Sequence, residues 1–64
     1  MAIGFIGIGN MGLPMAEHLL GAGLEMVVHD RRPDATAPLI ARQARPAQSP
    51  REVADRAATV FISL

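Results

Sequence analysis

The 64-residue chain contains no cysteine, tryptophan, tyrosine or lysine, and its only aromatic side chains are two phenylalanines. Without cysteine there is neither a disulfide framework nor a thiolate metal site, which is compatible with the reducing cytoplasm. With so few aromatic rings the chain has no surface for stacking nucleobases. Six basic residues balance six acidic ones, so we expect no nucleic-acid partner.

Long apolar runs are also missing. No segment is long enough to cross a bilayer. No charged segment precedes an apolar run at the start of the chain, which argues against a signal peptide. We therefore expect a cytoplasmic protein with no membrane partner, and a chain of this length holds one small domain at most.

Glycine, by contrast, occurs in a specific pattern. The strand-forming residues before Gly7 lead into Gly-Ile-Gly-Asn-Met-Gly, which spells G-x-G-x-x-G, and an apolar helical pattern follows at once. Gly7 permits a tight turn, Gly9 lets a pyrophosphate approach the backbone, and Gly12 allows close helix packing. The start of a helix also attracts phosphate groups. The motif predicts a nucleotide cradle, the alternative being a purely structural turn.

Apolar segments along the rest of the chain predict alternating strands and helices. Strands are expected at Ala2–Ile6, Glu25–His29 and Ala58–Leu64, with a brief strand within Arg45–Ala47; helices are expected at Met11–Leu20, Pro33–Arg42 and Pro50–Arg56. Such alternation implies parallel crossover units. The predicted fold class is α/β, a Rossmann-like doubly wound parallel sheet. We expect residues 1–64 to form the N-terminal portion of a dinucleotide-binding domain.

Three of these elements carry more detailed expectations. The first helix should bury Gly12, Met15, Ala16, Leu19 and Leu20, which share one face. Pro38 should leave the second helix short, kinked or started late, because a proline inside a helix costs about 3 kcal/mol. Ser49 and Glu52 have the spacing of a capping box. The final strand has the composition of a buried one.

Polar residues after the second expected strand suggest how a ribose would be recognised. Asp30 lies eighteen residues past the last glycine of the motif, where dinucleotide-binding folds place a ribose-binding acid; the alternative is a simple turn former. Arg31 and Arg32 are either solvated turn residues or contacts for a 2′-phosphate. Neither His18 nor His29 is surrounded by a group of carboxylate or cysteine residues that could form a metal site with it. We therefore expect His18 to be a surface side chain, His29 to be a strand-end residue, and no metal site.

The stretch from Phe5 to Gly23 resembles the N-terminal signature of the β-hydroxyacid dehydrogenases, which include 3-hydroxyisobutyrate dehydrogenase, tartronate semialdehyde reductase and glyoxylate reductases. Their G-x-G-x-M-G-x-P-M-A motif appears from Gly7 to Ala16. The S-P-R-E-V-A run that starts at Ser49 and the strand after it are also similar. Two departures, Pro38 and the Gln-Ala pair at positions 43–44 where Gly-Ala is common, concern the second helix and not the cofactor site.

This resemblance implies roles for individual residues. The pyrophosphate would be lined by Gly7, Ile8, Gly9, Asn10, Met11 and Gly12. Asp30, with Arg31 beside it, would face the adenine ribose, and Leu64 would begin the loop beside the nicotinamide. The family's catalytic lysine would lie beyond residue 64, in a helical substrate domain that this chain lacks. Since this chain has no lysine, no catalytic residue is carried over.

The resemblance also implies an activity, an NAD(P)-dependent dehydrogenase or reductase. Hydride would pass between the nicotinamide and a small β-hydroxyacid or its oxo form. We expect NAD rather than NADP, because the Asp30 carboxylate repels a 2′-phosphate. A non-catalytic dinucleotide-binding or interaction module is the alternative function, and association into a homo-oligomer is left open. FAD enzymes share the glycine spacing, but the M-G-x-P-M-A extension argues against them.

Overall fold

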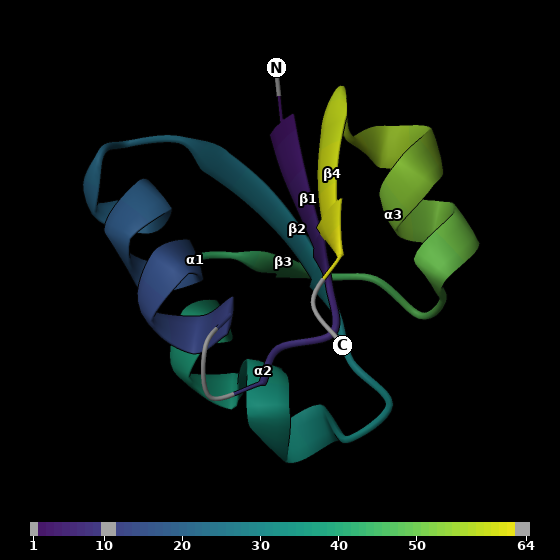
Figure 1. Cartoon of the computed structure of the whole chain (residues 1–64), viewed down its shortest axis with the longest axis horizontal. Helices are drawn as coiled ribbons and strands as arrows, with labels where there is room; N and C mark the ends of the chain where they lie inside the picture. The colour runs from purple at the N-terminus through teal and green to yellow at the C-terminus, as the bar shows by residue number, and fades with distance from the viewer. Residues whose placement is uncertain (1, 10–11, 63–64) are drawn as a thin grey trace.

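The computed structural model describes residues 2–9 and 12–62, which form a parallel sheet with helices on both faces (Figure 1). The strands are β1 (Ala2–Ile6), β2 (Glu25–His29), β3 (Arg45–Pro46) and β4 (Thr59–Ile62); the helices are α1 (Gly12–Gly21), α2 (Pro33–Ile40) and α3 (Pro50–Arg56). Within these residues, no helix has the length and apolar character needed to span a membrane.

The strand order β3-β2-β1-β4, with every pair parallel, is that of a doubly wound sheet. Crossovers between parallel strands are right-handed. The steps from β1 to β2 and from β2 to β3 therefore place α1 and α2 on one face. The step from β3 back past β1 to β4 places α3 on the other face, as Figure 1 shows. The predicted α/β fold class is confirmed, and the order reverses between β1 and β4.

The main core lies between the sheet and the pair α1 and α2. Its buried members are Phe5, Ile8, Ala16, Met26, Val28, Leu39 and Ala44. Leu13, Leu19 and Leu20 pack against this cluster from α1. The expectation that Met15 would be buried is wrong, since 52% of its surface is exposed. Leu13 instead packs toward the sheet, one helical turn before Ala16.

On the opposite face, α3 lies against the backbone of β1. A Cβ atom added to Gly4 would lie 2.9 Å from Ala57 Cβ and 3.3 Å from Val60 Cγ2, and closer still to Val53 Cγ1. Real side chains do not approach so closely, so only glycine fits at this position. The sequence motif assigned close helix packing to Gly12, and it gave no signal for Gly4.

The last strand differs from its prediction. β4 begins at Thr59, and its Phe61 and Ile62 side chains are 38% and 67% exposed. The expectation of a buried strand is wrong for these residues, because β4 pairs only with β1 in the described part of the chain. Phe61 still packs across the pair, with its ring centroid 5.3 Å from that of Phe5. Ser63 and Leu64 lie outside the described residues.

Helix α2 is short, which was one of the predicted outcomes of Pro38, and it ends in a Schellman motif. The Gln43 N–H donates to the Ile40 carbonyl at 2.9 Å, and the Ala44 N–H donates to the Leu39 carbonyl at 3.0 Å. Both Ala44 and Leu39 are buried in the core, which is the apolar contact that accompanies this motif. Gln43 has a φ of +77°, in the left-handed region where glycine is preferred.

Replacing Gln43 by glycine should therefore stabilise the protein. The left-handed conformation costs a non-glycine residue roughly 1–2 kcal/mol, of which the greater flexibility of unfolded glycine cancels part. We expect Gln43→Gly to raise the free energy of unfolding by about 0.5–1 kcal/mol in urea titrations of the full-length protein. Gly23 has a φ of +87° with open space around it, so it serves as the reciprocal control. Gly23→Ala should lower the free energy of unfolding. A change of the same sign in both variants would contradict the argument.

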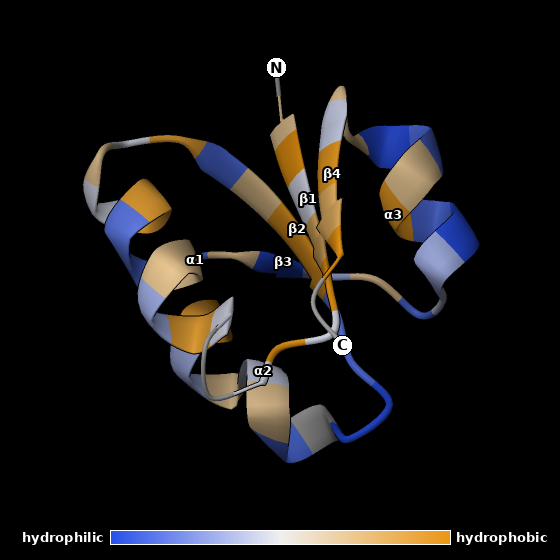
Figure 2. Ribbon diagram, in the orientation of Figure 1, coloured by the Kyte–Doolittle hydropathy of each residue, from blue (hydrophilic) through white to orange (hydrophobic). Residues whose placement is uncertain are grey.

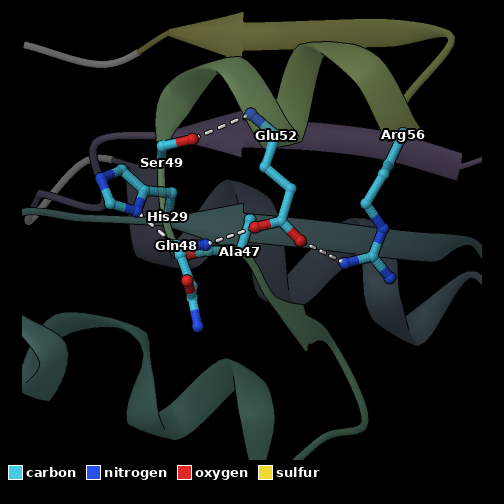
Figure 3. A network of polar contacts seen from close by, with 6 residues as sticks. All are labelled: His29, Ala47, Gln48, Ser49, Glu52 and Arg56. Carbon is cyan, nitrogen blue, oxygen red and sulfur yellow. Dashed lines mark hydrogen bonds and ion pairs between the residues drawn. The ribbon is translucent and has the colours of Figure 1, made fainter.

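Helix α3 begins with a modified capping box, shown in Figure 3. The Ser49 hydroxyl accepts a hydrogen bond from the Glu52 N–H at 3.1 Å, which confirms the predicted N-cap. The Glu52 carboxylate accepts from the Gln48 N–H at 2.8 Å, one residue before the expected partner. That bond, with help from Arg56 at 3.0 Å, holds the pKa of Glu52 below its usual value. The two bonds thereby fix the chain just before α3 to the first turn of the helix.

Candidate functional site

The carboxyl ends of β1, β2 and β4 border a hollow of about 840 Å³. It is lined by Ile6, Gly7, Ile8, Gly9, His29, Asp30, Arg31, Arg32, Pro50 and Ile62. Open α/β sheets bind their ligands at this edge, where the strand order reverses. The volume falls in the range of about 300–1,000 Å³ that is typical of small-molecule sites.

A second hollow, of about 600 Å³, adjoins the first on the side of α1 and α2. Four residues border both hollows: Ile8, Gly9, Arg31 and Arg32. The glycine loop and the turn after β2 thus face each other across one continuous region. A ligand that follows this region would contact both segments.

The three glycines of the loop have the features that a pyrophosphate cradle requires. Gly7 has a φ of +82°, and its N–H donates to the His29 carbonyl at 2.9 Å, which confirms the predicted tight turn. A Cβ atom added to Gly9 would meet no atom of the described residues within 4 Å, its chain neighbours aside, so its backbone is open to close approach from that side. Gly12 is buried at the start of α1. The residues present therefore fit a bound dinucleotide.

Asp30 connects this loop to the turn after β2. Its Oδ2 atom accepts a hydrogen bond from the Ile8 N–H at 2.6 Å, and its Oδ1 atom accepts one from the Arg32 N–H at 2.9 Å. The bond to Arg32 is the local contact expected if Asp30 is a turn former, which was the alternative prediction for this residue. The Ile8 bond spans 22 residues, and it uses the backbone of Ile8 while the side chain is buried in the core.

These contacts keep the Asp30 side chain ionised. The Arg32 N–H lowers the pKa of the Asp30 carboxyl most, burial opposes it, and the Ile8 N–H and nearby positive charge lower it further. The net effect lowers the pKa of Asp30 from its usual value of 3.8. The ionised carboxylate therefore stabilises the folded protein at pH values above 3.8, and this stabilisation is lost as the pH falls through the lowered pKa. An ionised carboxylate has about four acceptor positions, and two remain for ligand hydroxyls.

The two arginines after Asp30 add positive charge to the same region. Figure 2 shows the segment between β2 and α2 as strongly hydrophilic. Arg31 and Arg32 are exposed, and neither guanidinium forms an ion pair with another described residue. Their charges are therefore available to a ligand or to solvent.

Other predicted residues are separate from the site or outside the described chain. His18 is exposed in the last turn of α1. Asn10, Met11 and Leu64 lie outside the described residues, so their proposed contacts stay predictions. The sequence argument treated His29 only as the end of a strand, yet its side chain borders the hollow beside Asp30.

Residues 2–64 match the model of a protein family described as the NAD-binding domain of 6-phosphogluconate dehydrogenase. The chain belongs to this family. It is 37% identical over 62 residues to mitochondrial 3-hydroxyisobutyrate dehydrogenase of Bos taurus, which covers 97% of this chain and 18% of that protein. It is also 39% identical over 64 residues to an uncharacterized oxidoreductase of Bacillus subtilis, covering all of this chain and 22% of that one. The resemblance to the β-hydroxyacid dehydrogenases is thereby confirmed.

Solved structures agree with this assignment. An imine reductase of Streptomyces aurantiacus has a TM-score of 0.94 and 31% identity, covering all of this chain and 23% of that one. Two more distant proteins share the fold: an imine reductase variant of Myxococcus stipitatus in complex with NAD⁺ (22% identity, TM-score 0.92) and a reductive aminase of Aspergillus terreus in complex with NADPH (24% identity, TM-score 0.90), each covering 98% of this chain and 22% of its own. The chain spans about a fifth of the length of these relatives.

Proposed function

We propose that this chain is the N-terminal portion of the dinucleotide-binding domain of an oxidoreductase that moves hydride between a nicotinamide and a small β-hydroxyacid or its oxo form. One observation carries the proposal: an open glycine loop and an ionised carboxylate meet at the reversal point of the sheet. The relationship to a 3-hydroxyisobutyrate dehydrogenase supports the substrate class.

Each part of the site would hold one part of the cofactor. The backbone of Gly7 and Gly9, followed by the start of α1, would contact the pyrophosphate, with Asn10 and Met11 completing the loop. Asp30 would accept hydrogen bonds from the ribose hydroxyls through its two remaining acceptor positions. Leu64 would begin the loop toward the nicotinamide. The cofactor supplies the hydride chemistry, and this segment binds and orients it.

The rest of the proposed enzyme lies outside residues 1–64. A helical domain would supply the catalytic lysine and the contacts to the substrate. This agrees with the lengths of the relatives, of which this chain spans about a fifth. We place the enzyme in the cytoplasm, which the absence of cysteine favours over an oxidising compartment. It would act without nucleic-acid or membrane partners, as a monomer or a homo-oligomer.

We propose NAD rather than NADP as the preferred cofactor. Asp30 is held at the strand end by two backbone hydrogen bonds, so its charge stays near the ribose. Two like charges about 4 Å apart near a surface repel by roughly 4 kcal/mol at an effective dielectric constant of 20. Arg31 and Arg32 are exposed and would lose side-chain entropy on binding a phosphate, so they offset only part of this repulsion.

Steady-state kinetics on the full-length protein test this proposal. We expect kcat/KM with NAD to exceed that with NADP by at least about tenfold, given the repulsion above, with a small β-hydroxyacid as substrate. Asp30→Asn should raise relative NADP use, but it also removes one of two carboxylate acceptors and so weakens binding of both cofactors. Arg31→Ala leaves the carboxylate intact and should lower NADP use alone.

Two results would redirect the proposal. A wild type that prefers NADP, with the preference lost in Arg31→Ala, would make Arg31 the ribose-side determinant. Tight dinucleotide binding without turnover of any small hydroxyacid or oxoacid would instead favour the non-catalytic binding module.

A further inference from the structure

His29 ends β2 on the same face of the sheet as α3. Side chains alternate between faces along a strand, and Met26 and Val28 belong to the core on the side of α1 and α2. His29 therefore projects to the other face. There it lies beside the start of α3 and borders the larger hollow together with Asp30.

One ring nitrogen of His29 has a fixed role. The Nδ1 atom lies 3.1 Å from the Ala47 carbonyl oxygen, and a carbonyl only accepts hydrogen bonds, so Nδ1 carries a proton. Figure 3 shows the second nitrogen, Nε2, pointing away from Ala47, Ser49 and Glu52, toward the edge at which β4 ends. In the neutral ring Nε2 is an acceptor, and in the charged ring it becomes a donor.

The charges around this ring have both signs. Asp30 follows it directly after the end of β2, and Glu52 faces it from α3. Each of these carboxylates interacts electrostatically with His29. Arg31 and Arg32 border the same hollow from the turn. Histidine is the side chain that ordinarily changes charge between about pH 5 and 8. A charge that appears on His29 would thus lie within the proposed ribose site and would counter Asp30.

We infer that Nε2 of His29 contacts the adenosine half of the bound dinucleotide, and that protonation of this ring favours a 2′-phosphate. This inference rests on the proposed function. In the neutral state Nε2 accepts a hydrogen bond from a hydroxyl or amino group of the adenosine. In the charged state it donates to the cofactor and attracts phosphate, so the preference between NAD and NADP depends on pH.

The test measures dissociation constants of NAD and NADP by calorimetry on the full-length protein at about pH 6 and about pH 8. His29→Asn is the decisive variant, because its amide nitrogen can still donate to the Ala47 carbonyl while Nε2 is removed. His18→Asn is the matched control, since His18 is exposed on α1. The 2′-phosphate itself titrates near pH 6, so the quantity of interest is the difference between wild type and variant.

On lowering the pH, affinity for NADP relative to NAD should rise about three- to tenfold more in wild type and His18→Asn than in His29→Asn. A purely structural histidine would change both affinities together, and parallel pH profiles would overturn the inference while leaving the proposed function intact. Failure of wild type to bind either dinucleotide would overturn the proposed function itself. If His29→Asn does not fold, His29→Gln, which reaches the Nε2 position without titrating, must show the same loss of pH dependence.

Discussion

Gly9→Val should weaken dinucleotide binding by about 100-fold or more and leave the fold intact. Apart from the chain neighbours of Gly9, no described residue has an atom within 4 Å of a Cβ at this position. A valine side chain therefore has room there in the free protein but would occupy the proposed approach of the pyrophosphate. Loss of two or three charge-assisted hydrogen bonds, each about 1.5–3 kcal/mol, accounts for such an effect. Backbone strain does not contribute, because the described glycines with left-handed φ values are Gly7 and Gly23, and Gly9 is not among them.

Calorimetric titration of NAD into the full-length variant, together with its thermal unfolding midpoint, separates binding from folding. Gly21→Val is the matched control, since Gly21 ends α1 with open space around it and lies outside the hollow at the strand ends. The control should bind NAD as wild type does. Unchanged affinity in Gly9→Val would exclude the loop as the phosphate site.

Gly4→Val should abolish folding. The added atoms would overlap Val53, and Ala57 and Val60 block the other directions. Overpacking in a closed core ordinarily costs about 1–3 kcal/mol, and here the contact of the first added carbon alone forces α3 away from β1. We expect Gly4→Ala to lower the free energy of unfolding by about 3 kcal/mol. Gly4→Val adds two more methyl groups and should cost more than about 5 kcal/mol, the lower end of the 5–15 kcal/mol that stabilises a typical domain.

A double variant tests whether the close helix contact is the cause. Val53→Ala removes the atoms nearest to the new side chain, so Gly4→Ala combined with Val53→Ala should be more stable than the sum of the single effects predicts. Urea unfolding of the four proteins gives the coupling energy. Simple additivity would show that Gly4 acts through the strand backbone and not through α3.

Local patterns predicted most elements of this fold. The strands at Ala2–Ile6 and Glu25–His29 match the sequence periodicity residue for residue, because apolar runs bounded by glycine or charge specify their own limits. Ser49 is the predicted cap of α3. The glycine loop was also predicted, since its spacing reflects a turn that involves only neighbouring residues.

Features that depend on contacts between distant residues were not predicted. Gly4 resembles any glycine in the sequence until α3 is placed over β1. The bond between Ile8 and Asp30, which are 22 residues apart, requires the parallel pairing of β1 and β2. The role of His29 depends on Ala47, which reaches it only through β3. Exposure of Phe61 and Ile62 follows from the number of strands beside β4, which no local pattern encodes.

Asp30 has a consequence for the energetics of binding. Its two hydrogen bonds connect the glycine loop and the turn after β2 through one carboxylate. Both segments of the site are thus ordered when the sheet folds, and their conformational entropy is lost at that step instead of at ligand binding. On the proposed function, cofactor capture would then need little rearrangement of this backbone, because the acid proposed to select the nucleotide already holds the loop at Ile8 before binding.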